Sequence, residues 1–98
     1  MRAMNFRYTR HAIMRMTDRD FSTAEVEEAV IKGIIIREYP DDKPNPSALA
    51  VNIGTNGPLH VVYSISRAAS ESVCFIVTVY RPDPKEWNAT FTKRRKKI

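Results

Sequence analysis

A chain of 98 residues that is 43% hydrophobic and 28% charged has the size and composition of one small globular domain. Its longest apolar runs are much shorter than the roughly 20 residues that span a bilayer. Its first residues are basic, but the apolar stretch of a signal peptide does not follow them. A single cysteine, Cys74, excludes an internal disulfide and, with only two histidines, disfavours a structural zinc site. We therefore expect one cytoplasmic domain over residues 1–98, without membrane segment, metal or cofactor.

The net charge of +5 is distributed unevenly along the chain. Residues 1–20 carry a net charge of +3 and residues 85–98 carry +5, whereas residues 21–84 carry −3. If the two ends meet in the fold, they create a positive field that suits a polyanion such as nucleic acid. The alternative interpretation is that basic ends only keep a small protein soluble.

Two short helices are predicted in succession near the start of the chain. Thr9 is a plausible N-cap for a helix that runs to about Arg19 and buries an apolar stripe. Ser22 and Glu25 form a capping box at the start of the second helix, and Gly33 stands where a left-handed C-cap is expected.

After the helices the pattern changes to alternating apolar residues, which predicts four strands. They are expected at residues 34–39, 48–53, 59–66 and 73–80, and the short connections favour an antiparallel meander. Asn5–Tyr8 shows no clear strand pattern. Lys85–Phe91 is expected to form a helical turn that docks Trp87 and Phe91, before a basic tail at about 92–98. The predicted class is therefore α+β, with two N-terminal helices packed on a four-stranded antiparallel sheet.

Alternation also assigns the strand residues to two faces of the predicted sheet. The face expected to pack on the helices presents Leu49, Val51, Ile53, Leu59, Val61, Tyr63, Ile65, Val73, Phe75, Val77 and Val79. The opposite face includes Cys74, and hairpins centred on their turns would bring Asn52, His60 and Thr78 side by side on it.

His11, Arg15 and Arg19 form the most informative pattern in the sequence. Their i, i+4, i+8 spacing places them within about one quadrant of a helix at ~100° per residue. A histidine there can act as a general base, and two guanidinium groups can hold a phosphate. The alternative is a solvated face in which Arg15 pairs with Asp18, or Arg19 with another acidic residue.

His60 is the second candidate catalytic residue, and the alternative is a histidine whose ring is satisfied on a half-exposed strand. Tyr80 and Arg81 end the last strand, where they could stack a base and bind a phosphate. Packing is the favoured interpretation for Tyr80. The tail residues Lys93, Arg94 and Arg95 open a basic run that either grips a nucleic-acid backbone or only aids solubility.

Several spaced landmarks carry a resemblance to a known family. His11–Met16 has a His-Ala-x-x-Arg-Met core, and Arg19 and an acidic second helix follow it. Later landmarks appear in the order Pro58–Val62, Thr78–Tyr80, Pro82–Pro84 and Trp87. On these residues, from residue 8 to about 95, the chain resembles a group of small bacterial proteins known only as a domain of unknown function.

That family is distantly similar to the RelE, BrnT and MqsR toxins, which are mRNA endonucleases of type II toxin–antitoxin modules. The resemblance implies a RelE-like fold and metal-independent RNA cleavage, by attack of a 2′-hydroxyl on the adjacent phosphate. It implies RNA, including ribosome-bound mRNA, and an antitoxin of zinc-finger type as partners. His11 or His60 would then serve as base or acid, and Arg15, Arg19 and Arg81 would stabilise the phosphate.

Two other functions stay open beside the toxin hypothesis. One is a non-catalytic module that binds nucleic acid or protein through the same basic face. The other is a small structural domain that forms a homodimer through an exposed strand edge.

Overall fold

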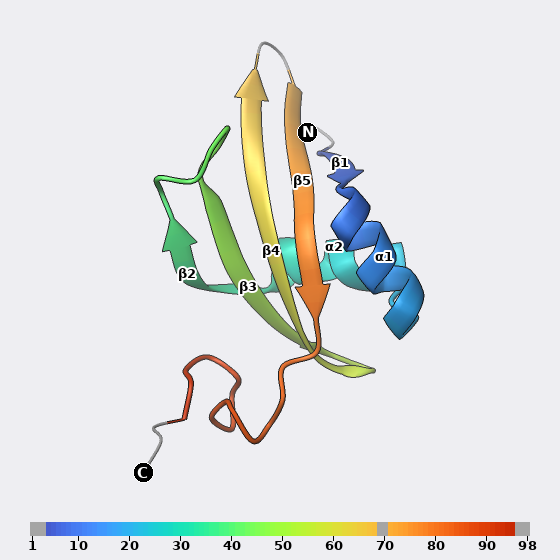
Figure 1. Ribbon diagram of the computed structural model, residues 1–98, viewed down its shortest axis with the longest axis vertical. Helices are drawn as coiled ribbons and strands as arrows, with labels where there is room; N and C mark the ends of the chain where they lie inside the picture. Colours follow the sequence, from blue (N-terminus) through green and yellow to red (C-terminus); the bar gives the residue numbers. More distant parts are fainter. Residues whose placement is uncertain (1–3, 69–70, 96–98) are drawn as a thin grey trace.

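In the computed structural model, which describes residues 4–68 and 71–95, five strands form one mixed sheet accompanied by two helices (Figure 1). The elements are β1 (Asn5–Tyr8), α1 (Arg10–Arg19), α2 (Thr23–Lys32), β2 (Ile34–Tyr39), β3 (Ser47–Gly54), β4 (Gly57–Ala68) and β5 (Glu71–Tyr80). The strand order is β1-β5-β4-β3-β2, so β2 lies at one edge of the sheet. The α1 helix contacts β5, and α2 contacts β3 and β4.

The α+β class is confirmed, but the expected four-stranded antiparallel sheet is wrong. Asn5–Tyr8 forms a fifth strand, which pairs in parallel with β5 from Asn5↔Val73 to Tyr8↔Ile76. These four residues show no decisive local pattern. Their strand conformation depends on backbone pairing with residues almost 70 positions later in the sequence.

Both predicted N-caps are present, because each satisfies backbone N–H groups that a helix start leaves free. Thr9 Oγ1 accepts a hydrogen bond from the Ala12 N–H at 3.1 Å, and it donates to the Val77 carbonyl at 2.8 Å. Ser22 Oγ accepts from the Glu25 N–H at 3.0 Å. The Thr9 hydroxyl therefore starts α1 and also anchors it to β5.

The left-handed C-cap predicted at Gly33 is wrong. Gly33 is extended, with φ −72° and ψ 168°. It is α1 that ends in a left-handed C-cap, at Asp20, with φ 58° and ψ 41°. Gly33 is needed for a different reason, which is lack of space. A Cβ there would lie 2.1 Å from the Ala29 carbonyl oxygen and 2.8 Å from that of Val51.

The face assignment is confirmed for β4 and wrong for β3. Ala50 pairs with Val61, and Ala50, not Leu49 or Val51, belongs to the core beneath the helices. The hairpin closes with Gly54 opposite Gly57, and this register shifts every β3 side chain to the other face from the one expected.

A register shift in the β4–β5 pairing alters the faces of β5. Val62 pairs with Thr78 and Tyr63 with Ile76, so Val77 is an extra residue on β5. As a result Cys74 and Ile76 point into the helix-side core, together with Val79. The predicted row of Asn52, His60 and Thr78 is therefore absent, because His60 lies between Val51 and Tyr80.

The core below the helices contains Ala12, Met16, Phe21, Val26, Ala29, Ala50, Leu59, Val61, Tyr63, Cys74, Ile76 and Val79. Both helices contribute to it, so one apolar layer fixes α1 and α2 against the same sheet. Within residues 4–68 and 71–95, neither helix is long and apolar enough to cross a membrane.

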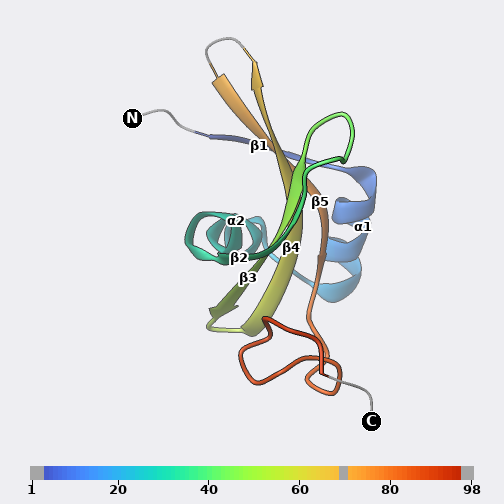
Figure 2. The same ribbon diagram turned by 90° about the vertical axis from the view of Figure 1, so that its left-hand side faces the viewer.

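The tail after β5 folds back as a loop at the end of the sheet instead of forming the expected helical turn over Lys85–Phe91 (Figure 2). One turn forms earlier, where the Trp87 N–H donates to the Asp83 carbonyl at 3.2 Å. The chain then reverses, and Trp87 pairs with Arg94 in an isolated bridge. Trp87 is nevertheless buried, as its predicted docking requires.

Candidate nucleic-acid interface

The His11, Arg15 and Arg19 row lies on α1 as the spacing predicts, and all three side chains are exposed. In the part of the chain that the structure describes, no ion pair joins Arg15 to Asp18 or Arg19 to any carboxylate. The row borders the buried side of α1, which Ala12 and Met16 form. Among the described residues, no ion pair therefore neutralises the two arginines of the row.

His60 occupies a different environment, because its ring is fully buried. Its Nε2 lies 2.8 Å from the Phe91 carbonyl oxygen, and its Nδ1 lies 3.0 Å from the Tyr80 hydroxyl. A carbonyl can only accept, so Nε2 carries the proton and Nδ1 accepts from Tyr80. The ring also meets those of Tyr80 and Trp87 edge-on, with centroids 5.1 Å and 4.5 Å away. His60 thus joins the sheet to the tail.

The described contacts of the His60 ring all lie on β5 and the tail, and none involves α1. The structure therefore does not bring the two candidate catalytic histidines together. Burial lowers the pKa of His60, against the opposing effect of its hydrogen bond to Phe91, and the nearby charge of Arg94 lowers it further. The ring is held in its neutral form within the fold.

This lowered pKa predicts a loss of stability in acid. An unfolded histidine titrates near 6.5, so below that pH the unfolded chain binds a proton that the folded chain resists. The contribution is fully present above pH 6.5 and declines as the pH falls toward the folded-state pKa. We expect the free energy of unfolding, measured with urea, to fall more across this pH window in the wild type than in His60→Gln. Glutamine is a neutral side chain of similar hydrogen-bonding capacity. Equal slopes for wild type and His60→Gln would refute the assignment.

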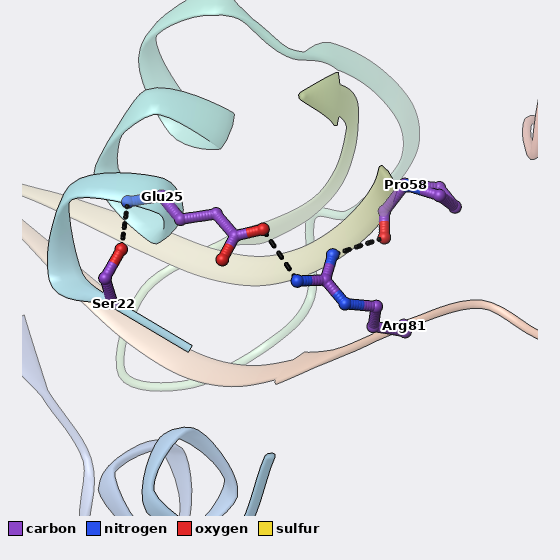
Figure 3. A network of polar contacts seen from close by, with 4 residues as sticks. All are labelled: Ser22, Glu25, Pro58 and Arg81. Atoms are coloured by element: carbon purple, nitrogen blue, oxygen red, sulfur yellow. Dashed lines mark hydrogen bonds and ion pairs between the residues drawn. The ribbon is translucent and has the colours of Figure 1, made fainter. Parts of the chain in front are cut away.

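Arg81 also has structural partners (Figure 3). Its Nη2 lies 2.8 Å from Glu25 Oε2, its Nη1 donates to the Pro58 carbonyl at 3.0 Å, and the guanidinium sits 4.8 Å from the centre of the Phe21 ring. Glu25 belongs to the first turn of α2, so this network ties that helix to the β3–β4 hairpin and the end of β5. In this structure, both terminal nitrogens expected to bind phosphate are used inside the fold.

The predicted site residue Tyr80 and the single cysteine, Cys74, also face inward. The Tyr80 hydroxyl is engaged with His60, and its aromatic ring packs on the same histidine. Cys74 is buried in the core, where burial raises the pKa of its thiol to about 12. A thiol with this pKa stays protonated and inert at neutral pH.

Two of the tail cations, Lys93 and Arg94, line a cavity that the sequence patterns did not reveal. Its volume is about 290 Å³, and it is lined by Ile36, Arg37, Leu49, Trp87, Thr92, Lys93 and Arg94. Arg37, on the edge strand β2, is the member that sequence reasoning missed. Arg95 lies in the same segment, where its Nε donates to the Pro84 carbonyl at 3.0 Å.

The two basic regions do not merge into one site among the described residues. The α1 helix lies beside β5, whereas the tail forms a separate loop at the end of the sheet (Figures 1 and 2). No described ion pair or side-chain hydrogen bond links residues 82–95 to α1. Lys96 and Lys97, the end of the basic run, lie outside the described residues.

The family comparison matches the part of the chain that contains both helices and the main strands. A model described as Domain of unknown function (DUF4258) matches residues 8–81. The chain belongs to the DUF4258 family. Within this DUF4258 protein the matched region includes the α1 row and Arg81, while Trp87, Lys93 and Arg94 follow it. No curated protein and no solved structure matches the chain significantly.

Proposed function

We propose that this protein binds single-stranded RNA through the exposed row of His11, Arg15 and Arg19. The observation that carries the proposal is that the three side chains share one helix face and no described carboxylate pairs with them. At a rise of 1.5 Å per residue the row is about 12 Å long, so it can contact more than one phosphate. Arginine suits this role because its planar fork matches phosphate oxygens.

The net charge supports the same proposal. The chain carries +5, and its cations concentrate at the two ends of the sequence. Such a field attracts a polyanion over a distance, and binding releases the counterions condensed on it. The resemblance to RNA-cleaving toxins supports RNA as the polyanion, with a zinc-finger antitoxin as the protein partner.

Binding of a labelled single-stranded RNA, measured by fluorescence anisotropy, tests the proposal. Arg15→Gln should raise Kd about fivefold or more and reduce the slope of log affinity against log salt by about one, because one phosphate contact is lost. Arg67→Gln removes an exposed arginine on β4 and should leave both values unchanged. If the two variants bind RNA equally well, the α1 row is not the interface.

The second candidate function is cleavage of the bound RNA, which His11 favours because its exposed imidazole lies one helical turn from Arg15. His11 would take the proton of a 2′-hydroxyl, whose oxygen then attacks the adjacent phosphorus. The bond to the 5′-oxygen breaks, that oxygen gains a proton from water, and a 2′,3′-cyclic phosphate remains. Arg15 would stabilise the charge on the phosphate.

Incubation of RNA with the protein in EDTA separates the two candidates. Cleavage predicts a cyclic-phosphate product that His11→Ala abolishes while RNA binding persists. Intact RNA at saturating wild-type protein contradicts the nuclease candidate and leaves a non-catalytic binding module.

A further inference from the structure

The cavity between β2, β3 and the tail has the make-up of an anion site. Three of its lining residues, Arg37, Lys93 and Arg94, are cations, and none of the lining residues is acidic. In residues 4–68 and 71–95, Arg37 and Lys93 form no ion pair, and Arg94 pairs with Glu86 at 3.1 Å. Three cations with one paired carboxylate leave excess positive charge at the cavity, and a bound anion would relieve their mutual repulsion.

A β-bulge turns Arg37 toward this cavity. Ile35 pairs with Ala50 and Arg37 with Leu49, so Ile36 is an extra residue in β2. Without the extra residue, alternation from Ile34 would place residue 37 on the helix side of the sheet. The bulge instead places Arg37 on the face of Leu49, which lines the cavity with it.

The tail loop holds the other two cations in place. Asn88 Oδ1 accepts hydrogen bonds from the backbone N–H groups of Thr92 at 2.9 Å and Lys93 at 3.3 Å. The Asn88 N–H in turn donates to the Lys93 carbonyl at 2.9 Å. The cation-bearing segment is therefore fixed by hydrogen bonds to the side chain and backbone of Asn88, as a preorganised site requires.

The Arg94 guanidinium provides a flat surface as well as charge. It lies 5.1 Å from the centre of the Trp87 ring, yet the Arg94 side chain is 67% exposed. The guanidinium thus lies over an aromatic ring while solvent reaches most of the side chain. Nucleobases stack on such guanidinium planes in single-stranded RNA complexes.

We infer that this cavity binds a nucleoside monophosphate unit, with the base stacked on Arg94 and the phosphate between Arg37 and Lys93. The unit is either a free nucleotide or the 5′-phosphorylated end of an RNA strand. Binding of the RNA strand end rests on the proposed RNA-binding function, and it specifies which part of the RNA this cavity recognises. A volume of about 290 Å³ lies near the lower end of the range for small-molecule sites.

Trp87 is the single tryptophan in the chain, so its fluorescence reports directly on this cavity. We expect AMP to change the Trp87 emission saturably, and adenosine and inorganic phosphate each to bind at least tenfold more weakly. Arg37→Gln should weaken AMP binding at least tenfold, whereas Arg67→Gln, an exposed arginine on β4, should match wild type. Absence of a saturable AMP response, equal AMP affinity in the two variants, or phosphate binding as tight as AMP would each overturn the inference.

Anisotropy of labelled RNA distinguishes the two ligand sources and the two proposals. Tighter binding of 5′-phosphorylated than of 5′-hydroxyl RNA, with competition by AMP, supports the strand end. RNA binding that persists without an AMP response overturns the cavity inference and leaves the α1 proposal standing. A saturable AMP response without any RNA binding overturns the α1 proposal and the strand-end form, and assigns the cavity to a free nucleotide.

Discussion

Gly33→Ala is expected to lower the free energy of unfolding by about 3 kcal/mol, at the upper end of the usual cost of overpacking. The added methyl group would lie 2.1 Å from the Ala29 carbonyl oxygen and 2.8 Å from the Val51 carbonyl oxygen. Both atoms belong to backbone, so neither can move aside by a rotamer change. Relief requires the end of α2 to shift away from β3, and this shift would open the core that Ala29 helps to form.

Urea or thermal unfolding, followed by circular dichroism, measures this effect. For a domain of this size the midpoint temperature should fall by about 10 °C or more. Gly54→Ala is the matched control, because a Cβ there meets only the Asn52 side-chain nitrogen at 3.9 Å. Its effect should stay within about 0.5 kcal/mol, as for most changes away from special backbone sites. If the two variants lose equal stability, close approach at Gly33 does not explain the result.

Arg81→Met is expected to destabilise the fold by about 2 kcal/mol, because it removes two hydrogen bonds of a charged group. Methionine keeps an unbranched apolar chain against Phe21 but leaves Glu25 and the Pro58 carbonyl without their partner. The Glu25 side chain is only 15% exposed, so water replaces the lost contact incompletely. The predicted cost therefore arises mainly from an uncompensated, mostly buried carboxylate.

A double-mutant cycle with Glu25→Gln measures the coupling directly. We expect the double variant to be less destabilised than the sum of the single variants. Lys32→Met serves as the control, since its ion pair with Glu28 spans 4.0 Å and its side chain is 71% exposed. That change should cost less than about 0.5 kcal/mol. If Arg81→Met costs no more than Lys32→Met, Arg81 has no structural role, and its use in phosphate binding becomes the better interpretation.

The helices were predictable because their signals are local. Thr9 and Ser22 cap backbone groups only three residues away, and the apolar spacing of α1 lies within ten residues. The exposed row of His11, Arg15 and Arg19 follows from the same periodicity. The sequence correctly identifies Gly33 as the end of α2, but the left-handed conformation predicted for it is wrong. Gly33 is constrained instead by the close approach of Val51, which belongs to another element.

The sheet was less predictable because the face of each strand depends on register. In β4 the alternation of Leu59, Val61 and Tyr63 was sufficient, since those residues are bulky and all buried on one face. In β3 both faces are covered, so small Ala50 and larger Leu49 are both buried and periodicity could not choose between them. The extra residues Ile36 in β2 and Val77 in β5 shift the alternation of side chains between the two faces of the sheet. No residue pattern in the sequence indicates these two bulges.

The sequence by itself determined that two capped helices precede a strand-rich segment, and that His11, Arg15 and Arg19 share one helix face. Only the tertiary structure decided whether the other candidate site residues are exposed for binding or engaged inside the fold. It buried His60 between Tyr80 and the tail, engaged Arg81 with Glu25, and brought Arg37 to the tail cations. The physical reason is distance along the chain. A helix face is set within a few residues, whereas burial, ion pairing and cavity formation depend on which distant segments meet.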